Sequence, residues 1–331
     1  MATRTDARSF ASLLTTAALV AALSPCAALA QPGVDDIQAA FELGESSIDF
    51  AQSIAGLVTV RDGVDLGIIG YDVDDENNTD ILLLELQAGR VFDMFGAGAP
   101  GLLVEGAATY ARASGELDDL FFGLAPGFES EVDFEFRTLT GQIGAGPVFE
   151  AGEGITLTPM VNLSASYIVS DADYGGPGAL IAETVADGVA FNWEAGALAI
   201  GVAARAEYVT MIDEDVEFRL LGRYDGRFIE TIAEDDPAQE FSGSLQFFTI
   251  RAGFAGPTET ELFGGTLGWR GSLGYTVFAE GDIFGSDDYL QLTLGADLIG
   301  GTGLGTRLTA NVTAILGEDL DGIGGSLELG F

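Results

Sequence analysis

The chain has 331 residues, a formal net charge of −39 at pH 7, no histidine and one cysteine. So large an acidic excess repels polyanions and excludes nucleic acid as a partner. The absence of histidine excludes Ser-His-Asp triads, Cys-His pairs and His-ligated zinc. The mean hydropathy of +0.30 is high for a chain with 20% charged residues, yet after residue 30 no apolar run is long enough for a transmembrane helix.

The first 30 residues have the pattern of a secretory signal peptide. Arg4 and Arg8 give a positively charged start, and residues 10–23 are mostly apolar but too few to span a bilayer. Small residues precede the predicted cleavage site between Ala30 and Gln31. Cleavage there removes the only cysteine, so the mature chain forms no disulfide.

Residues 31–53 carry apolar side chains among acids and are predicted to be a linker or plug, which lies in the periplasm or threads the pore. Residues 54–73 could add a hairpin. The next acidic stretch spaces oxygen ligands at Asp72, Asp74 and Glu76, but it lacks the central glycine and final bidentate glutamate of an EF-hand. We interpret it as a solvated acidic loop, with weak divalent-cation binding as the alternative.

Alternation of apolar with small or polar residues dominates the rest of the chain, and this period of two predicts β-strands. The predicted strands cover residues 79–90, 101–112, 131–146, 155–169, 189–212, 216–231 and 240–255, followed by four clearer strands that begin near residues 267, 290, 304 and 323. The range 189–212 is long enough for one strand or two. The longer loops at 113–130, 171–188 and 232–239 are expected to be extracellular.

Dispersed, alternating hydrophobicity predicts an all-β fold, a transmembrane antiparallel up-and-down β-barrel. The strand count is 12 if 189–212 is split and 54–73 stays outside the wall, and 14 if 54–73 is also paired. We favour 12. The barrel domain is predicted to span residues 54–331, after the signal peptide (1–30) and the linker or plug (31–53).

Charged side chains inside the predicted strands fall on the face opposite the apolar one. An arginine that faces lipid near the bilayer midplane costs about 2–4 kcal/mol. We therefore expect these charges to line the lumen, where guanidinium and carboxylate groups can pair. The predicted lumen charges are Arg137, Arg219, Arg223, Arg227, Arg251, Arg270, Arg307, Glu217 and Asp225.

The chain ends in an alternating strand, with Leu327, Leu329 and Phe331 on one face. This end resembles the C-terminal assembly signal of outer-membrane barrels of Gram-negative bacteria, and the final four-strand meander resembles the 12-stranded translocators of autotransporters. Only residues 31–53 or so separate the predicted cleavage site from the first strands, so the chain resembles the solitary, passenger-less autotransporter-like barrels. The resemblance implies an outer-membrane location, contact with lipid and periplasmic chaperones, and insertion by the barrel-assembly machinery through the C-terminal strand.

The resemblance implies no known biochemical activity. The leading hypothesis is therefore a non-enzymatic outer-membrane barrel of unknown role, without a cofactor. The acidic excess supports an alternative, a small cation-preferring porin or substrate channel. A third hypothesis is an outer-membrane hydrolase or lipid-modifying enzyme. Paired carboxylates such as Asp133 and Glu135 can in principle hydrolyse glycosides, but no pair is singled out by its neighbours and we identify no catalytic residues.

Overall fold

The computed structural model describes residues 64–73, 79–93, 99–117, 130–188, 190–234, 240–280, 286–300, 307–318 and 320–330. In these ranges twelve antiparallel strands form a closed barrel, in which each strand pairs with its neighbours in sequence and β1 pairs with β12. This confirms the predicted up-and-down barrel. The predicted signal peptide, residues 31–53, Asp74, Glu76 and Phe331 lie outside the described residues.

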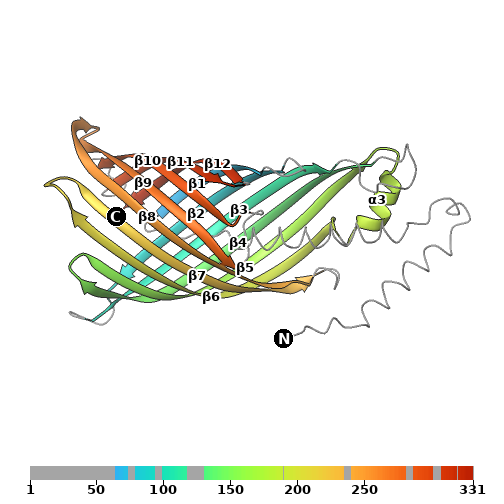
Figure 1. Cartoon of the computed structure of the whole chain (residues 1–331), viewed down its shortest axis with the longest axis horizontal. Helices are drawn as coiled ribbons and strands as arrows, with labels where there is room; N and C mark the ends of the chain where they lie inside the picture. The colour runs from blue at the N-terminus through green and yellow to red at the C-terminus, as the bar shows by residue number, and fades with distance from the viewer. Residues whose placement is uncertain are drawn as a thin grey trace, which may run out of the picture.

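The strands differ in length around the barrel (Figure 1). They are β1 (Val64–Val73), β2 (Thr79–Phe92), β3 (Gly101–Leu117), β4 (Glu131–Gly152), β5 (Ile155–Gly175), β6 (Trp193–Met211), β7 (Glu217–Glu234), β8 (Ser242–Leu262), β9 (Gly265–Glu280), β10 (Asp288–Ile299), β11 (Arg307–Gly317) and β12 (Leu320–Gly330). A helix, α3 (Ala179–Ala186), lies between β5 and β6. No helix in the described ranges is long and apolar enough to cross a membrane. Because β1 has 10 residues and β4 has 22, one side of the wall is much taller than the other.

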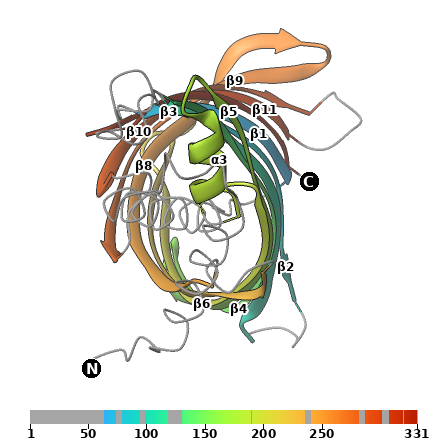
Figure 2. The same ribbon diagram turned by 90° about the vertical axis from the view of Figure 1, so that its right-hand side faces the viewer.

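The two ends of the barrel are built differently. At the end where β1 begins and β12 ends (the terminal end), β4 joins β5 and β8 joins β9 through two-residue turns. These turns contain Gly154 at φ 70° and Gly264 at φ 79°, a left-handed conformation that glycine adopts without a Cβ clash. The opposite end (the loop end) has the longest connections and α3, which lies across the mouth of the barrel in Figure 2.

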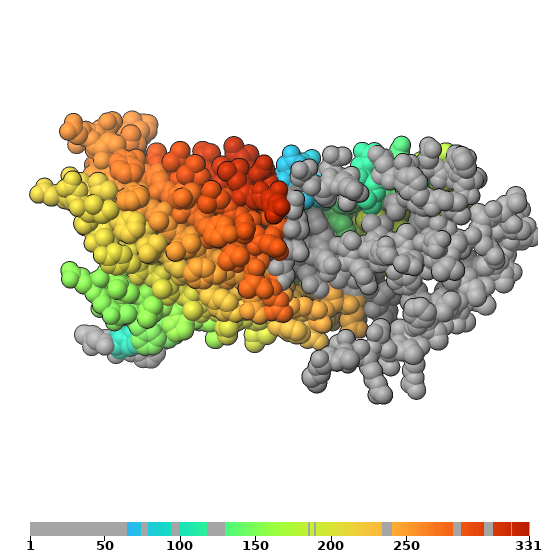
Figure 3. Space-filling view, in the orientation of Figure 1, coloured from blue at the N-terminus to red at the C-terminus, as the bar shows by residue number. Residues whose placement is uncertain are grey.

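The outer wall carries the apolar face that the alternation predicts. In β2, Leu82, Leu84 and Leu86 are exposed, whereas Ile81 and Leu83, which alternate with them, are buried. The expected outward faces of β9 and β10 are confirmed in the same way. Figure 3 shows the wall as a continuous surface over the strands from β7 (yellow) to β12 (red). A continuous apolar surface of this kind suits a lipid environment.

Tyrosines mark the border of this apolar wall toward the loop end. Tyr167, Tyr224 and Tyr275 are exposed. Their hydroxyl groups donate hydrogen bonds to polar side chains of the adjacent strands, nearer the loop end, and the acceptors are Glu194, Gln246 (3.0 Å) and Asp288 (2.8 Å). An amphipathic ring with its polar tip directed away from the apolar band is typical of an interfacial aromatic girdle.

Aromatic rings also gather at the border near the terminal end. Tyr208, Phe218 and Phe254 follow one another on β6, β7 and β8, with ring centroids 6.5 and 5.2 Å apart. Trp269 continues the series on β9, opposite Gly256 of β8. Exposed apolar side chains such as Leu163 and Leu292 lie in the band between the two aromatic borders, as in a membrane barrel.

The predicted number of 12 strands is right, but the set of segments that form these strands differs from the prediction. The range 189–212 contains one strand, β6, because the tall side of the wall runs for 19 residues without a turn. Residues 64–73 supply the missing strand, since β1 pairs with both β2 and β12 and closes the barrel. The tall wall also explains why β3 and β5 continue for several residues into the expected loops 113–130 and 171–188.

The interior of the loop half is apolar. Phe134 and Phe136 of β4 are buried and pack against Phe191 and Trp193, with ring centroids 5.8 and 6.0 Å apart. Buried alanines of α3 and apolar side chains of β2, β7, β8, β9 and β12 complete this cluster. Asn192, at φ 60°, links the segment after α3 to the barrel wall. Its Oδ1 accepts a hydrogen bond from the backbone N–H of Ala172 in β5 (2.7 Å).

Candidate functional site

The interior of the terminal half is ionic, and β7 supplies many of its charges. Successive side chains of a strand point to opposite faces of the sheet. The outward face of β7 carries exposed aromatic residues such as Tyr224 and Phe228. Its inward face therefore carries one charged row, made of Glu217, Arg219, Arg223, Asp225 and Arg227.

Asp225 bridges two arginines within this row. Arg223 donates to Asp225 Oδ2 from Nε (3.0 Å) and Nη2 (2.8 Å), and Arg227 donates to Oδ1 from Nε (2.9 Å). The side chains of Arg223, Asp225 and Arg227 are 10%, 0% and 2% exposed. Asn162 of β5 also donates to Asp225 (3.4 Å). Because buried charges are tolerated only when they are paired and hydrogen-bonded, the three ionic side chains form one unit.

This unit reaches across the lumen. Nη2 of Arg223 lies 3.4 Å from Oε1 of Glu105, which belongs to β3 and is 1% exposed. Strands β4, β5 and β6 lie between β3 and β7 in the barrel order, so the contact does not follow the wall. The ion pair therefore bridges the interior over the inner faces of β4, β5 and β6.

A second carboxylate between two arginines lies closer to the terminal end. Glu207 of β6 is 2.9 Å from Arg205 on its own strand and 3.1 Å from Arg219 on β7. Arg219 also lies 3.3 Å from Glu217. The pairing places two guanidinium groups side by side, because the carboxylate between them offsets their repulsion.

A third bridge involves the short side of the barrel. Asp297 of β10 is buried, lies 3.0 Å from Arg270 of β9 and pairs with Arg307 of β11. Thr309 donates a hydrogen bond to the same carboxylate (2.6 Å). Arg270 also lies 3.0 Å from Glu328 of β12, so this network ties four consecutive strands together.

Glycines opposite the arginines leave room for the arginine side chains. A Cβ added at Gly201 would lie 2.9 Å from Cγ of Arg227, and one at Gly295 would lie 2.9 Å from Cγ of Arg270. Each glycine is the cross-strand partner of the arginine concerned. Small residues beside large ones are the usual way in which a narrow barrel accommodates its inward side chains.

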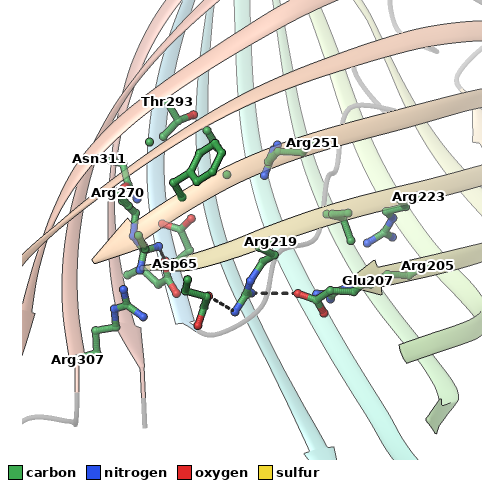
Figure 4. A pocket seen from close by; sticks show the side chains of 18 residues that line it. Asp65, Arg205, Glu207, Arg219, Arg223, Arg251, Arg270, Thr293, Arg307 and Asn311 are labelled. Atoms are coloured by element: carbon green, nitrogen blue, oxygen red, sulfur yellow. Dashed lines mark hydrogen bonds and ion pairs between the residues drawn. The ribbon is translucent and has the colours of Figure 1, made fainter. Parts of the chain in front are cut away.

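A cavity of about 240 Å³, which we call the arginine cavity, lies among these groups (Figure 4). Its wall includes six arginines and four acids, namely Arg205, Arg219, Arg223, Arg251, Arg270, Arg307, Asp65, Glu207, Glu217 and Glu328. Figure 4 shows the labelled arginines reaching it from several strands. The chain as a whole is strongly acidic, but cations outnumber anions on this wall.

Eight of the nine predicted lumen charges point into the barrel and come together in its terminal half. They are Arg219, Arg223, Arg227, Arg251, Arg270, Arg307, Glu217 and Asp225. Arg251 donates to the amide oxygen of Gln291 (2.7 Å). The prediction missed several acceptors of these arginines, Glu105, Glu207, Asp297 and Glu328. Each of them lies on the inward parity of its strand, so the rule that selected the arginines could have found them.

Arg137 is the exception, and its predicted place in the lumen is wrong. It points outward from β4 with its side chain 44% exposed, lies 3.2 Å from Glu135 and pairs with Asp171 of β5. The interior is apolar near the loop end. Phe134 and Phe136 therefore point inward, and the charged residues that alternate with them point outward.

Of the three acidic candidates near the start of the barrel, the structure describes Asp72 alone. Asp72 is exposed on β1, where the register places it between Asp80 of β2 and Asp321 of β12. No group of three or more acids, histidines or cysteines that could hold a metal ion occurs among the residues that the structure describes. Asp74 and Glu76 lie outside those residues.

The last strand forms the closing seam of the barrel. Leu327 and Leu329 lie opposite Leu66 and Val64 of β1, and Leu327 is exposed on the outer wall. Phe331 lies outside the described residues. The role of this end as an assembly signal stays a prediction.

No family model matches the chain, and no curated protein matches it. Solved structures do. The transport unit of the autotransporter AIDA-I from Escherichia coli aligns with 87% of this chain and 99% of its own, at a TM-score of 0.51 and 10% identity. The chain has the fold of an autotransporter translocator barrel.

Two further translocators match this fold at lower TM-scores. The translocator domain of NalP from Neisseria meningitidis has a TM-score of 0.46 and 12% identity, over 88% of this chain and 95% of its own. The beta domain of the Bordetella autotransporter BrkA has a TM-score of 0.45 and 12% identity, over 81% and 99%. At such identities the likeness concerns the fold alone.

Proposed function

We propose that this chain is a non-enzymatic outer-membrane barrel, similar to the translocator barrel of an autotransporter, whose lumen is closed to solutes. The observation that carries the proposal is the contact of Arg223 with Glu105 across the interior, held in place by Asp225. The apolar cluster of the loop half adds a second obstruction. A barrel that conducts solutes instead keeps its inward charges apart and hydrated.

Several features support a place in the outer membrane. The outer wall is apolar between two aromatic borders, and the fold is that of outer-membrane translocators. We place the terminal end in the periplasm, because β1 begins there, β12 ends there and the longest connections lie at the opposite end. The predicted signal peptide would direct export, residues 31–53 would serve as linker or plug, and the end at Phe331 would engage the barrel-assembly machinery after delivery by periplasmic chaperones.

Planar-bilayer recording of refolded residues 31–331 tests the closed lumen. We expect no stable single-channel openings, because the Arg223–Glu105 pair and the apolar cluster of the loop half obstruct the interior. Heat-modifiable migration on a detergent gel verifies that the protein is folded before it is recorded. Stable, ion-selective openings of the folded protein would refute closure, and a second recording without residues 31–53 shows whether that segment contributes to it.

The arginine cavity favours one further candidate, a small channel. Cation preference was expected from the acidic excess of the chain, but the charges on the cavity wall have the opposite balance. If the barrel conducts, we expect it to prefer anions, because selectivity follows the charges that line the pore. The sign of the reversal potential in a potassium chloride gradient decides between the two preferences.

A further inference from the structure

The arginine cavity presents guanidinium groups, and two of the carboxylates that bridge its arginines, Asp225 and Asp297, are not part of its wall. The side chains of Arg219 and Arg307 are 47% and 32% exposed, whereas that of Asp297 is 1% exposed. A guanidinium carries five N–H donors, and a carboxylate engages two of them at most in a bidentate pair. Donors of the cavity arginines therefore remain directed at solvent inside a recess of the barrel.

A second observation concerns donors without acceptors on the same wall. Nε of Arg270 and Nε of Arg307 are buried, and neither has a hydrogen-bond partner in the part of the chain that the structure describes. Both arginines line the cavity. A buried donor without an acceptor is unfavourable, so a small movement of either side chain toward an acceptor in the cavity is expected to be favourable.

The recess has the size and the lining for a compact anion. Its volume of about 240 Å³ corresponds to roughly eight water molecules at their liquid volume. The planar fork of arginine matches the oxygens of phosphate and carboxylate groups in bidentate geometry. Thr293 and Asn311 add neutral polar groups to the wall. The four acids that share the wall repel a large polyanion more strongly than a small anion of low charge.

We propose that the arginine cavity binds a small soluble anion through a phosphate or carboxylate group, held chiefly by Arg219, Arg251 and Arg270. The inference rests on the proposed closed barrel, because a lumen that ends at the Arg223–Glu105 pair retains a ligand that enters from the terminal end. The ligand would therefore come from the periplasmic side.

Calorimetric titration of refolded residues 31–331 with inorganic phosphate, in an uncharged detergent at low ionic strength, tests the proposal. We expect saturable binding at one site that weakens as salt is added. Arg251→Gln and Arg219→Gln should each weaken binding about tenfold, because each removes a charged donor. Arg137→Gln is the matched control: its side chain is 44% exposed, close to the 47% of Arg219, but it lies on the outer wall and should leave affinity unchanged.

Two outcomes overturn the anion site: no saturable phosphate binding by the folded barrel, or an equal loss of affinity in Arg137→Gln. If Arg219→Gln does not fold, Arg251→Gln decides the matter, because Arg251 donates to the neutral Gln291. Acetate in competition with phosphate tests the carboxylate class. Conductance separates this inference from the proposed function. A closed barrel without phosphate binding refutes the site alone, whereas a conducting barrel that binds phosphate refutes closure alone.

Discussion

The two halves of the barrel interior are built from the same strands with opposite chemistry. In the loop half, Phe134 and Phe136 of β4 point inward, and the charged residues that alternate with them point outward. In the terminal half, Arg223 and Arg227 of β7 point inward and the aromatic residues face outward. Both strands alternate with a period of two. Alternation therefore shows which residues share a face, whereas the height of a residue in the wall determines whether the apolar or the charged side chains point inward.

The two halves should also differ in how their stability is lost. The apolar cluster is held by burial and close packing, so truncation there costs the contacts of the missing atoms and the cavity left behind. The ionic half is held by buried charges that are stable only when they are paired. Removal of one charge therefore leaves its partner buried and uncompensated. Substitutions in each half can separate these two mechanisms.

Asp225→Asn is expected to have the largest effect. It leaves Arg223 and Arg227 buried without the carboxylate that joins them, and we expect unfolding to become easier by roughly 3–5 kcal/mol. The measurement is urea-induced unfolding in detergent micelles, followed by the loss of heat-modifiable migration. Asp171→Asn removes one of the two carboxylate partners of the exposed Arg137 and serves as control, with a loss of about 1 kcal/mol at most. Equal losses in the two variants would show that the buried unit is not special.

Phe136→Ala tests the apolar half. Phe136 is buried against Phe191 and Trp193, and its truncation should cost about 3 kcal/mol in the same unfolding experiment. Phe136→Leu keeps much of the side-chain volume and should lose less than half of that amount. If the leucine variant is as unstable as the alanine variant, lost volume is not the cause and the apolar cluster is not packed as described.

Much of the wall could be predicted from the sequence, because lipid on one face imposes strict alternation. The final four strands and the arginines of β7 follow from that rule. The contact between Arg223 and Glu105 could not be predicted, since three strands separate β3 from β7 and only closure of the barrel brings them together. Helix α3 was also missed. It has eight residues, no side-chain cap and no acid in its first turn, so its stability comes from packing in the barrel mouth and leaves no local signal.

Gly201→Ala is expected to have the smallest of the three effects, and it shows how finely the ionic half is fitted. A Cβ at this position would lie 2.7 Å from the carbonyl oxygen of Gly226 and 2.9 Å from Cγ of Arg227. Arg227 cannot withdraw easily, because its Nε is held by Asp225, so we expect a loss of about 1–3 kcal/mol from overpacking.

Gly141→Ala is the matched control, since Gly141 lies in β4 and a Cβ there meets nothing within 4 Å. Loss of glycine's conformational freedom in the unfolded chain should make this variant neutral or slightly more stable. A loss at Gly141 equal to that at Gly201 would mean that glycine is needed for strand geometry in general. A loss confined to Gly201 would show that the missing side chain opposite Arg227 is part of the ionic unit. Of the two variants, only Gly201→Ala places a methyl group against a paired arginine.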